Sequence, residues 1–272
     1  MINTAKFSLV RKMILISLLA FVLLASTGGL VLSAQELTGP EIIQKVDSAP
    51  TPETTNATLT MKLVNKEGEE KIRKLEAWKR GNEDSVMVFR APENAAGTAL
   101  LKTVNDKGEE NAWLYLPSLN LTKNMSQEVR NKKFMGSDFS YDDLGARNTD
   151  EYTYELLRVD NSAGEKIYVV EGVAEKPEMT GYSKIRSWVS EKYWKPEKVE
   201  YYDLEGELLK VQRNSSIEKI KGFWVVQKMT MENKQKGSKT VLNWKDYRIN
   251  KELPENIFKP EMLPEFKNGE TH

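Results

Sequence analysis

The sequence contains no cysteine and one histidine, His272, which lies at its C-terminal end. Without cysteine the protein has neither a disulfide nor a thiol nucleophile. A Ser-His-Asp or Cys-His system needs a histidine held by the fold, and an ordinary zinc site needs several histidine or cysteine ligands. These absences exclude most hydrolase chemistry. They predict a protein that is not an enzyme and that uses no metal and no cofactor.

Paired carboxylates could still act as general acid and base, and the tightest acidic group consists of Asp138, Asp142 and Asp143. The same group could bind calcium, but it lacks the alternating Asp or Asn residues and the central Gly of a calcium loop. We favour a structural interpretation, in which these acids complement the dipole at the start of a short helix.

The chain also lacks an excess of either charge, with 40 basic and 40 acidic residues. Removing residues 1–34 would take away Lys6, Arg11 and Lys12 and no acid, leaving 37 basic and 40 acidic residues. Nucleic-acid binding needs a basic surface. We therefore expect no nucleic-acid partner.

The first residues have the layout of an export signal. Lys6, Arg11 and Lys12 precede the apolar run 13–24, and small residues lead to the sequence Ser33-Ala34-Gln35. We expect cleavage after Ala34, so that residues 1–34 are a signal peptide and the protein works in the periplasm or at the outer face of the cytoplasmic membrane. The alternative is an uncleaved membrane anchor, because residues 13–34 are long enough to cross a bilayer. The chain has no cysteine for a lipid anchor of its own.

Residues 35–272 read as a single domain, because no linker rich in Pro, Gly or Ser divides them. Thr38 and Glu41 have the spacing of a capping box, which predicts a helix that ends near Ser48. Beyond it, short segments of alternating apolar and polar residues are separated by Gly-containing turns and give about twelve candidate strands. This pattern predicts a mainly β fold with short helices, in which an antiparallel sheet curls and buries one face.

The two-residue period also predicts which side chains face inward. We expect a common apolar interior formed by Leu59, Met61, Leu63, Val86, Val88, Trp113 and Tyr115.

Residues 125–147 interrupt the strand pattern with the string KFMGSDFSYDDL at 133–144. We expect a loop followed by a short helix over 139–144, with Ser137 or Asp138 as its N-cap. Glycine at the centre of the string would allow a sharp turn. The segment is either a movable lid over the concave face or a permanent plug, and its candidate lid residues are Phe134, Met135, Gly136, Phe139 and Tyr141.

Several segments together carry a family likeness. They are Ala96–Leu101, Asn111–Pro117, Phe134–Leu144, Trp194–Gly206 and Leu253–Leu263. In order and spacing the chain resembles the LolA-like outer-membrane lipoprotein-sorting family over essentially all of residues 35–272. The resemblance implies a strongly curved, incomplete antiparallel β-barrel of the LolA/LolB kind, covered by helices, whose apolar concavity receives acyl chains. It transfers no ligand-contacting residue position by position.

The resemblance further implies a carrier of lipid or acylated lipoprotein that passes its cargo from a membrane-bound donor complex to an acceptor complex. Each acyl methylene exposed to water costs about 0.8 kcal/mol, so such a cargo needs a shield between membranes. The seven inward residues are then candidates for the lipid cavity. The alternative is a non-transporting module, either an accessory subunit of a membrane exporter or an envelope structural protein.

Overall fold

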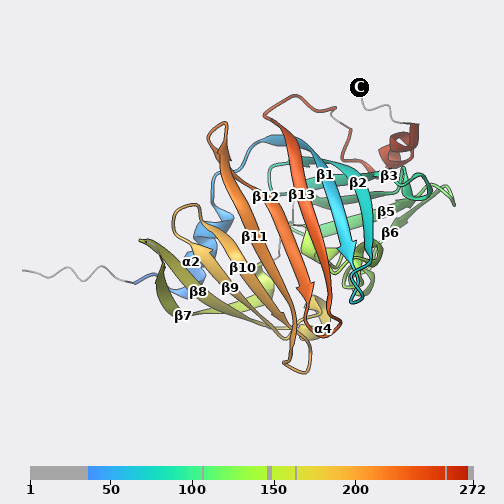
Figure 1. Cartoon of the computed structure of the whole chain (residues 1–272). Coiled ribbons are helices and arrows are strands. Elements are labelled where there is room, and N and C mark those ends of the chain that lie inside the picture. The colour runs from blue at the N-terminus through green and yellow to red at the C-terminus, as the bar shows by residue number, and fades with distance from the viewer. Residues whose placement is uncertain (1–35, 106, 146–148, 163, 255, 269–272) are drawn as a thin grey trace, which may run out of the picture. The chain divides into compact units, whose positions relative to one another are not determined.

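The computed structural model describes residues 36–105, 107–145, 149–162, 164–254 and 256–268, and the predicted signal peptide lies outside them. Within this part, residues 37–268 form one compact unit built on thirteen antiparallel strands (Figure 1). The strands are β1 (Thr54–Val64), β2 (Glu70–Arg80), β3 (Asp84–Ala91), β4 (Ala99–Val104), β5 (Glu110–Leu116), β6 (Leu121–Asn124), β7 (Tyr152–Ser162), β8 (Glu165–Ala174), β9 (Lys184–Ser190), β10 (Lys195–Tyr202), β11 (Leu208–Ile220), β12 (Phe223–Asn233) and β13 (Ser238–Ile249).

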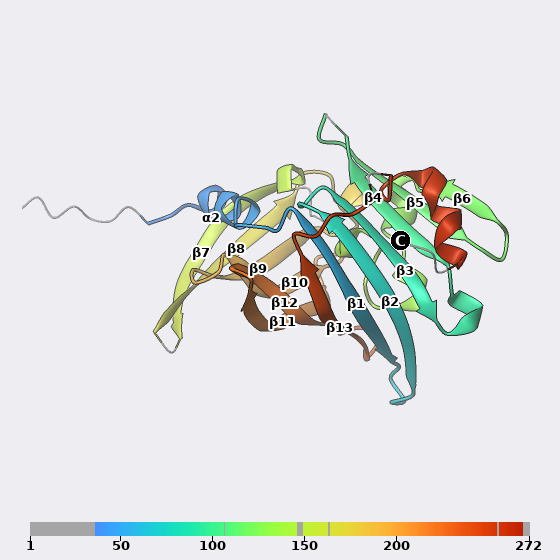
Figure 2. The same ribbon diagram turned by 90° about the horizontal axis from the view of Figure 1, so that it is seen from above.

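All thirteen strands belong to one sheet, in the order β6-β5-β4-β3-β2-β1-β13-β12-β11-β10-β9-β8-β7. Strands that follow one another in the chain pair with each other, except β6 and β7, and β1 also pairs with β13, for example Leu59 with Trp244. This pair joins two meanders, β1 to β6 and β7 to β13. β6 and β7 remain as the two edges, so the sheet is curved but not closed (Figure 2). The predicted incomplete antiparallel barrel is confirmed.

Short helices accompany the sheet. They are α2 (Gly39–Asp47), α3 (Gln127–Arg130), α4 (Pro177–Thr180) and the 3-10 helices η1 (Glu93–Ala95), η2 (Phe134–Gly136), η3 (Asp142–Leu144), η4 (Thr149–Glu151) and η5 (Pro260–Asn268). Figure 2 shows α2 beside β7 and β8, and η5 beside β4, β5 and β6. None of the helices in the described residues is both long and apolar enough to cross a membrane.

Helix α2 is the one predicted from its capping box, and the box is present. The Glu41 amide donates to Thr38 Oγ1 at 3.4 Å, and the Thr38 amide donates to the Glu41 carboxylate at 2.7 Å. A Cβ atom on Gly39 would lie 2.8 Å from the backbone of Tyr154 and Glu155 in β7. Glycine is therefore needed at the first helical residue, because it lets the helix approach the sheet directly.

The two faces of the sheet carry separate apolar clusters. The inner face holds the larger cluster, which has members from both meanders and from the segment between β6 and β7. The outer face of β2 to β5 holds a second cluster under the C-terminal segment. Its members are Trp78, Val86, Val88, Ala99, Leu101, Tyr115, Ile257, Phe258, Leu263 and Phe266, and Trp113 packs against it.

This division corrects the predicted interior. Leu59, Met61 and Leu63 belong to the inner face, but Val86, Val88, Trp113 and Tyr115 point to the outer face and pack on or near η5. The reason is that β3 is buried on both sides: Val86, Met87, Val88 and Phe89 are all buried, and Met87 and Phe89 belong to the inner cluster. When both faces of a strand are apolar, the two-residue period no longer distinguishes them.

The other differences between prediction and structure are local. Strand β6 was not predicted because Leu121–Asn124 is short and mostly exposed, so it has no apolar alternation. The predicted helix over 139–144 is wrong. Instead, the segment contains η2, an isolated bridge between Lys133 and Ser140, and the single turn of η3.

Candidate functional site

The concave inner face is covered by residues 125–145, between β6 and β7, which we call the insert. Phe134 and Phe139 are fully buried, and Tyr141 is nearly so. The Phe134 ring lies 5.6 Å from Phe89 of β3 and 5.3 Å, edge-on, from Tyr141. The insert therefore supplies aromatic side chains to the core of the sheet, an arrangement that adds specific ring contacts to simple burial.

The predicted sharp turn lies in η2. Gly136 has φ of +77° and Met135 has φ of +47°, so two successive residues adopt positive φ. Arg73 of β2 donates to the Met135 carbonyl oxygen, and the Phe134 amide donates to Phe139 O at 2.7 Å. The turn points Phe134 and Phe139 toward the same cluster and leaves Met135 partly buried at its rim.

Asp138 ties the insert to β13. Its carboxylate accepts hydrogen bonds from Thr240 Oγ1 at 2.9 Å and from Ser238 Oγ at 2.6 Å, and its amide donates to Thr240 Oγ1 at 2.9 Å. Lys133 Nζ lies 3.6 Å from the same carboxylate. Asp138 does not cap a helix. It fixes the insert to a strand one hundred residues further along the chain.

Asp143 makes a second attachment, to β11. Its carboxylate lies 2.5 Å from Lys210 Nζ and accepts from the Tyr182 hydroxyl at 2.9 Å and the Ser140 amide at 2.6 Å. Both members of the ion pair are almost fully buried, with 2% of the Asp143 side chain and 5% of the Lys210 side chain exposed. Lys210 Nζ also lies 4.9 Å from the ring of Tyr182 and 5.1 Å from that of Tyr201, which favours the cation further.

The surroundings of Asp143 set its charge. Burial alone would raise the pKa of Asp143, but the Lys210 charge and the hydrogen bonds from Lys210, Ser140 and Tyr182 outweigh it and lower the pKa below its usual value. Burial and the nearby Asp143 charge raise the pKa of Tyr182 well above its ordinary range. Asp143 is therefore an ionised acceptor, and Tyr182 remains a neutral donor.

Asp142 makes the third attachment, to the first meander. Its Oδ1 lies 3.6 Å from Nζ of Lys102 on β4 and 3.7 Å from Nε of Arg130 on α3, and Glu110 on β5 pairs with both cations at 2.9 and 2.6 Å. Gln127 Nε2 donates to Asp142 Oδ2 at 2.8 Å. Burial raises the pKa of Asp142 despite these cations. Three carboxylates of the insert thus contact strands of both meanders.

Beside the insert, the inner face forms a partly open cavity of about 280 Å³, which we call the inner cavity. Strands β1, β2, β3, β12 and β13 form its walls together with Lys195 of β10 and the insert residues Asp143 to Gly145. Its lining is mainly apolar and includes Ala57, Ala77, Met87, Leu144, Val226, Met229, Trp224 and Trp244. The volume is close to the lower end of the range for small-molecule sites, about 300 to 1,000 Å³.

A second cavity, of about 650 Å³, also borders Asp143. It is lined mainly by polar side chains, including Glu109, Glu110, Arg130 and Asp150. An apolar ligand would gain little from such walls. No group of three or more His, Cys, Asp or Glu residues in the described ranges has the arrangement to hold a metal ion.

Comparison with known proteins identifies the family. A family model described as an uncharacterized protein matches residues 81–265. An outer membrane lipoprotein-sorting protein domain from Vibrio parahaemolyticus is 30% identical, with a TM-score of 0.77 over 83% of this chain and 98% of that chain. The chain belongs to the LolA-like lipoprotein-sorting family.

Two further solved structures resemble this LolA-like chain. A DUF1329 family protein from Desulfovibrio piger is 27% identical, with a TM-score of 0.76 over 82% of this chain and 96% of that chain. A LolA superfamily protein from Nitrosomonas europaea, 24% identical, has a TM-score of 0.66 over 82% of this chain and 98% of that chain and supports the shared fold. The comparison with curated proteins gave no match.

The predicted site residues of this LolA-like protein divide into two groups. Leu59, Met61 and Leu63 lie in or against the inner cluster, as do Phe134, Met135, Phe139 and Tyr141 of the insert, and Gly136 forms its turn. The other four predicted cavity residues lie on the outer face. Sequence reasoning missed the polar attachments Lys210 and Thr240 and the cavity residues Trp224, Trp244 and Lys79, because only the fold brings them to the insert.

Breaking the buried pair Asp143–Lys210 on one side only should destabilise the LolA-like fold. Asp143→Asn leaves Lys210 buried without its counter-charge, and Lys210→Met leaves the carboxylate unpaired, so each should cost about 3 to 5 kcal/mol. The double variant should cost much less than the sum, since neither charge then remains buried. Urea unfolding followed by tryptophan fluorescence measures all three. Lys192→Met, at the exposed pair with Glu165, is the control and should cost less than about 1 kcal/mol.

The same variants give a pH test. Because the folded-state pKa of Asp143 is depressed, its contribution to stability is present above the ordinary aspartate pKa, about 3.9, and is lost as the pH falls below that value. Asp143→Asn should therefore remove part of the acid dependence of wild-type stability. Additive single-variant losses together with an unchanged acid dependence would contradict the assigned role of the pair.

Proposed function

We propose that this protein is an exported carrier of acylated lipid or lipoprotein, which shields acyl chains in the inner cavity and passes them between membrane complexes. The observation that carries the proposal is the apolar inner cavity between the concave sheet and the insert, in a chain of the lipoprotein-sorting family. Burial of an acyl chain against Met87, Met229 and Trp244 would remove each methylene from water at a gain of about 0.8 kcal/mol.

Location in the periplasm or at the outer face of the cytoplasmic membrane follows from the export signal predicted at residues 1–34 and fits the lipoprotein-sorting relative. A carrier in this compartment acts in outer membrane biogenesis, with a membrane-bound donor and a membrane-bound acceptor as partners. The role is not catalytic. The ionised groups of the insert are engaged in attachments to the sheet, which supports a structural role for them.

The second candidate is a non-transporting module, such as an accessory subunit of a membrane exporter or an envelope structural protein. An uncleaved segment 1–34 would favour this role, because it would hold the domain at one membrane. The inner cavity favours the carrier, since a purely structural module has no need of an apolar hollow.

Native mass spectrometry of the protein purified from its own envelope fraction tests the carrier directly. We expect a fraction of the folded protein to carry a non-covalent adduct whose mass matches a lipid or an acylated peptide. A variant with a filled cavity, Ala77→Phe, should lose the adduct while an outer-face substitution, Lys74→Gln, keeps it. Protein that carries no acyl-containing adduct under any purification would contradict the carrier and favour the module.

The insert is the lid of this carrier in our proposal, with Phe134, Met135, Gly136, Phe139 and Tyr141 as its residues. A cavity of about 280 Å³ is small for a multiply acylated cargo, so the insert has to move when such a cargo enters. Its attachments suit that movement. The free energy of a buried ion pair is largely offset by lost hydration, and the charged groups regain water when the insert swings out.

Phe139→Ala separates a lid from a permanent plug. For a lid, the variant should change the rate of transfer of a fluorescent lipid to acceptor vesicles while costing the fold less than the about 3 to 5 kcal/mol typical of a truncated core phenylalanine. Phe266→Ala is the matched control, because Phe266 is as buried as Phe139 but packs under the outer face against Trp78. It should cost the full amount and leave transfer by the folded fraction unchanged. A large loss of stability by Phe139→Ala with unaltered transfer would show a plug.

A further inference from the structure

Two lysines contribute to the lining of the inner cavity. Lys79 lies near the end of β2 and continues the phase of Leu75 and Ala77, which belong to the inner cluster. Lys195 opens β10 and reaches the same cavity from the other meander. The Lys79 side chain is solvent-accessible and lines the inner cavity, so its ammonium group can reach a ligand bound there.

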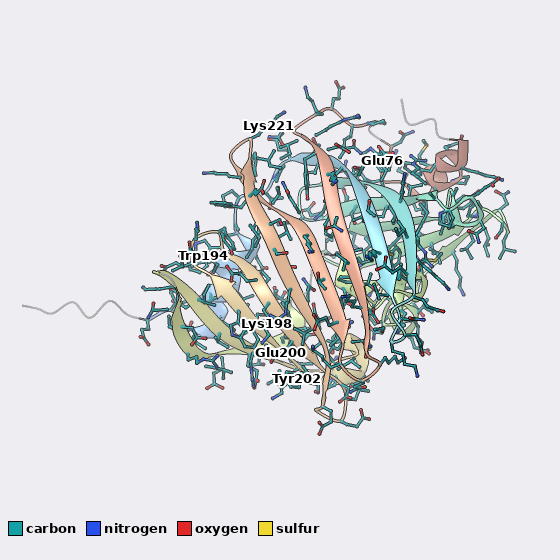
Figure 3. The ribbon with its side chains drawn as sticks, in the orientation of Figure 1. Glu76, Trp194, Lys198, Glu200, Tyr202 and Lys221 are labelled. Atoms are coloured by element: carbon teal, nitrogen blue, oxygen red, sulfur yellow. The ribbon has the colours of Figure 1, made fainter. Side chains whose placement is uncertain are left out.

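Two nearby cations on the outer face, Lys198 and Arg90, are paired. Lys198, on the same strand as Lys195, lies 2.6 Å from the Glu200 carboxylate and 3.8 Å from the centre of the Trp188 ring. Figure 3 labels Lys198, Glu200 and Tyr202 along this strand, and Glu76, the partner of Arg90, on β2. Glu76 of β2 and Lys198 of β10 thus carry compensated charges on the outer face.

The two cavity lysines lack such compensation. Throughout the described ranges, no carboxylate lies within ion-pair distance of Lys79 or Lys195, and neither gains from an acidic neighbour. Burial lowers the pKa of both, and the positive charge of Lys195 lowers the pKa of Lys79 further. Two like charges close together in a partly dehydrated cavity repel each other, so an anion between them would remove both penalties.

The walls around these lysines determine what kind of anion fits. Trp224, Met229 and Trp244 line the same cavity, and the Trp224 ring packs 5.6 Å from Tyr193. A small free anion would leave this apolar surface in contact with water. An anionic amphiphile suits both the apolar walls and the lysines, because its chain covers the walls while its headgroup pairs with the ammonium groups.

We infer that the inner cavity binds an anionic amphiphile, with Lys79 and Lys195 holding a phosphate or carboxylate headgroup and the apolar walls holding one acyl chain. The inference rests on the proposed carrier function and specifies the class of its ligand. An uncharged acyl ester would occupy the walls equally well but would leave the two lysines uncompensated. The cavity thus selects for charge at the headgroup and for an apolar chain beyond it.

The test compares two double variants that remove equal charge from the same two strands. Lys79→Gln with Lys195→Gln changes the cavity, whereas Lys74→Gln with Lys198→Gln changes the outer face. The probes are dodecyl phosphate, dodecanoate, uncharged dodecylglycerol and inorganic phosphate, each titrated below its micelle concentration by calorimetry. Urea unfolding establishes that both variants are folded.

We expect the wild type and the outer-face variant to bind the two anionic probes about tenfold to a hundredfold more tightly than dodecylglycerol, as charge-assisted hydrogen bonds allow. The cavity variant should lose this preference and still bind dodecylglycerol. Added salt should lower the affinity for the anionic probes more in the wild type than in the cavity variant.

Three other outcomes would overturn the inference, and one of them would also overturn the proposed function. If dodecylglycerol binds and the wild type shows no preference for the anionic probes, the inference is wrong while the carrier function stands. Inorganic phosphate binding as tightly as dodecyl phosphate would overturn the amphiphile, because the chain would then contribute nothing. If no chain-bearing probe binds, both the inference and the proposed function fail.

Discussion

The structure depends on one constraint: a curved sheet that does not close leaves an apolar inner face without a partner. Strands β6 and β7 each pair on one side only and leave the sheet open, so its inner side chains are covered by the insert and by α2. The insert packs on this face with Phe134, Phe139 and Tyr141. The inner cavity lies beside the insert, where the sheet's curvature leaves space that it does not fill.

Polar groups decide how that cover is placed. Asp138, Asp142 and Asp143 reach β13, β4 and β11, so three carboxylates within six residues orient the insert across both meanders. Burying charges costs hydration free energy, and the attraction within an ion pair offsets this cost only when the geometry is close. These contacts therefore give the insert a defined position rather than a large net stability. The same low dielectric makes uncompensated cations, such as Lys79 and Lys195, unfavourable without an anion.

The strands and the first helix could be predicted because their signals are local. Thr38 and Glu41 are three residues apart, and β1 alternates Leu59, Met61 and Leu63 with polar residues. The sequence could not show which side chains of β3 point to the inner face, since Val86 to Phe89 are all apolar. The ion pair of Asp143 with Lys210 spans 67 residues and leaves no local pattern. Lys79 did carry a signal, because it follows Leu75 and Ala77 in phase, but a lysine at a strand end is ordinarily solvated.

The central claim is that an acyl chain lies in the inner cavity, and contact quenching of tryptophan measures this most directly. A fatty acid brominated along its chain quenches only the indole rings that it touches, and Trp224 and Trp244 line the cavity. The account predicts saturable quenching in the wild type and its loss when both residues are replaced by phenylalanine, with the acid still bound. Quenching of equal depth in the doubly substituted protein would place the chain elsewhere and contradict the account.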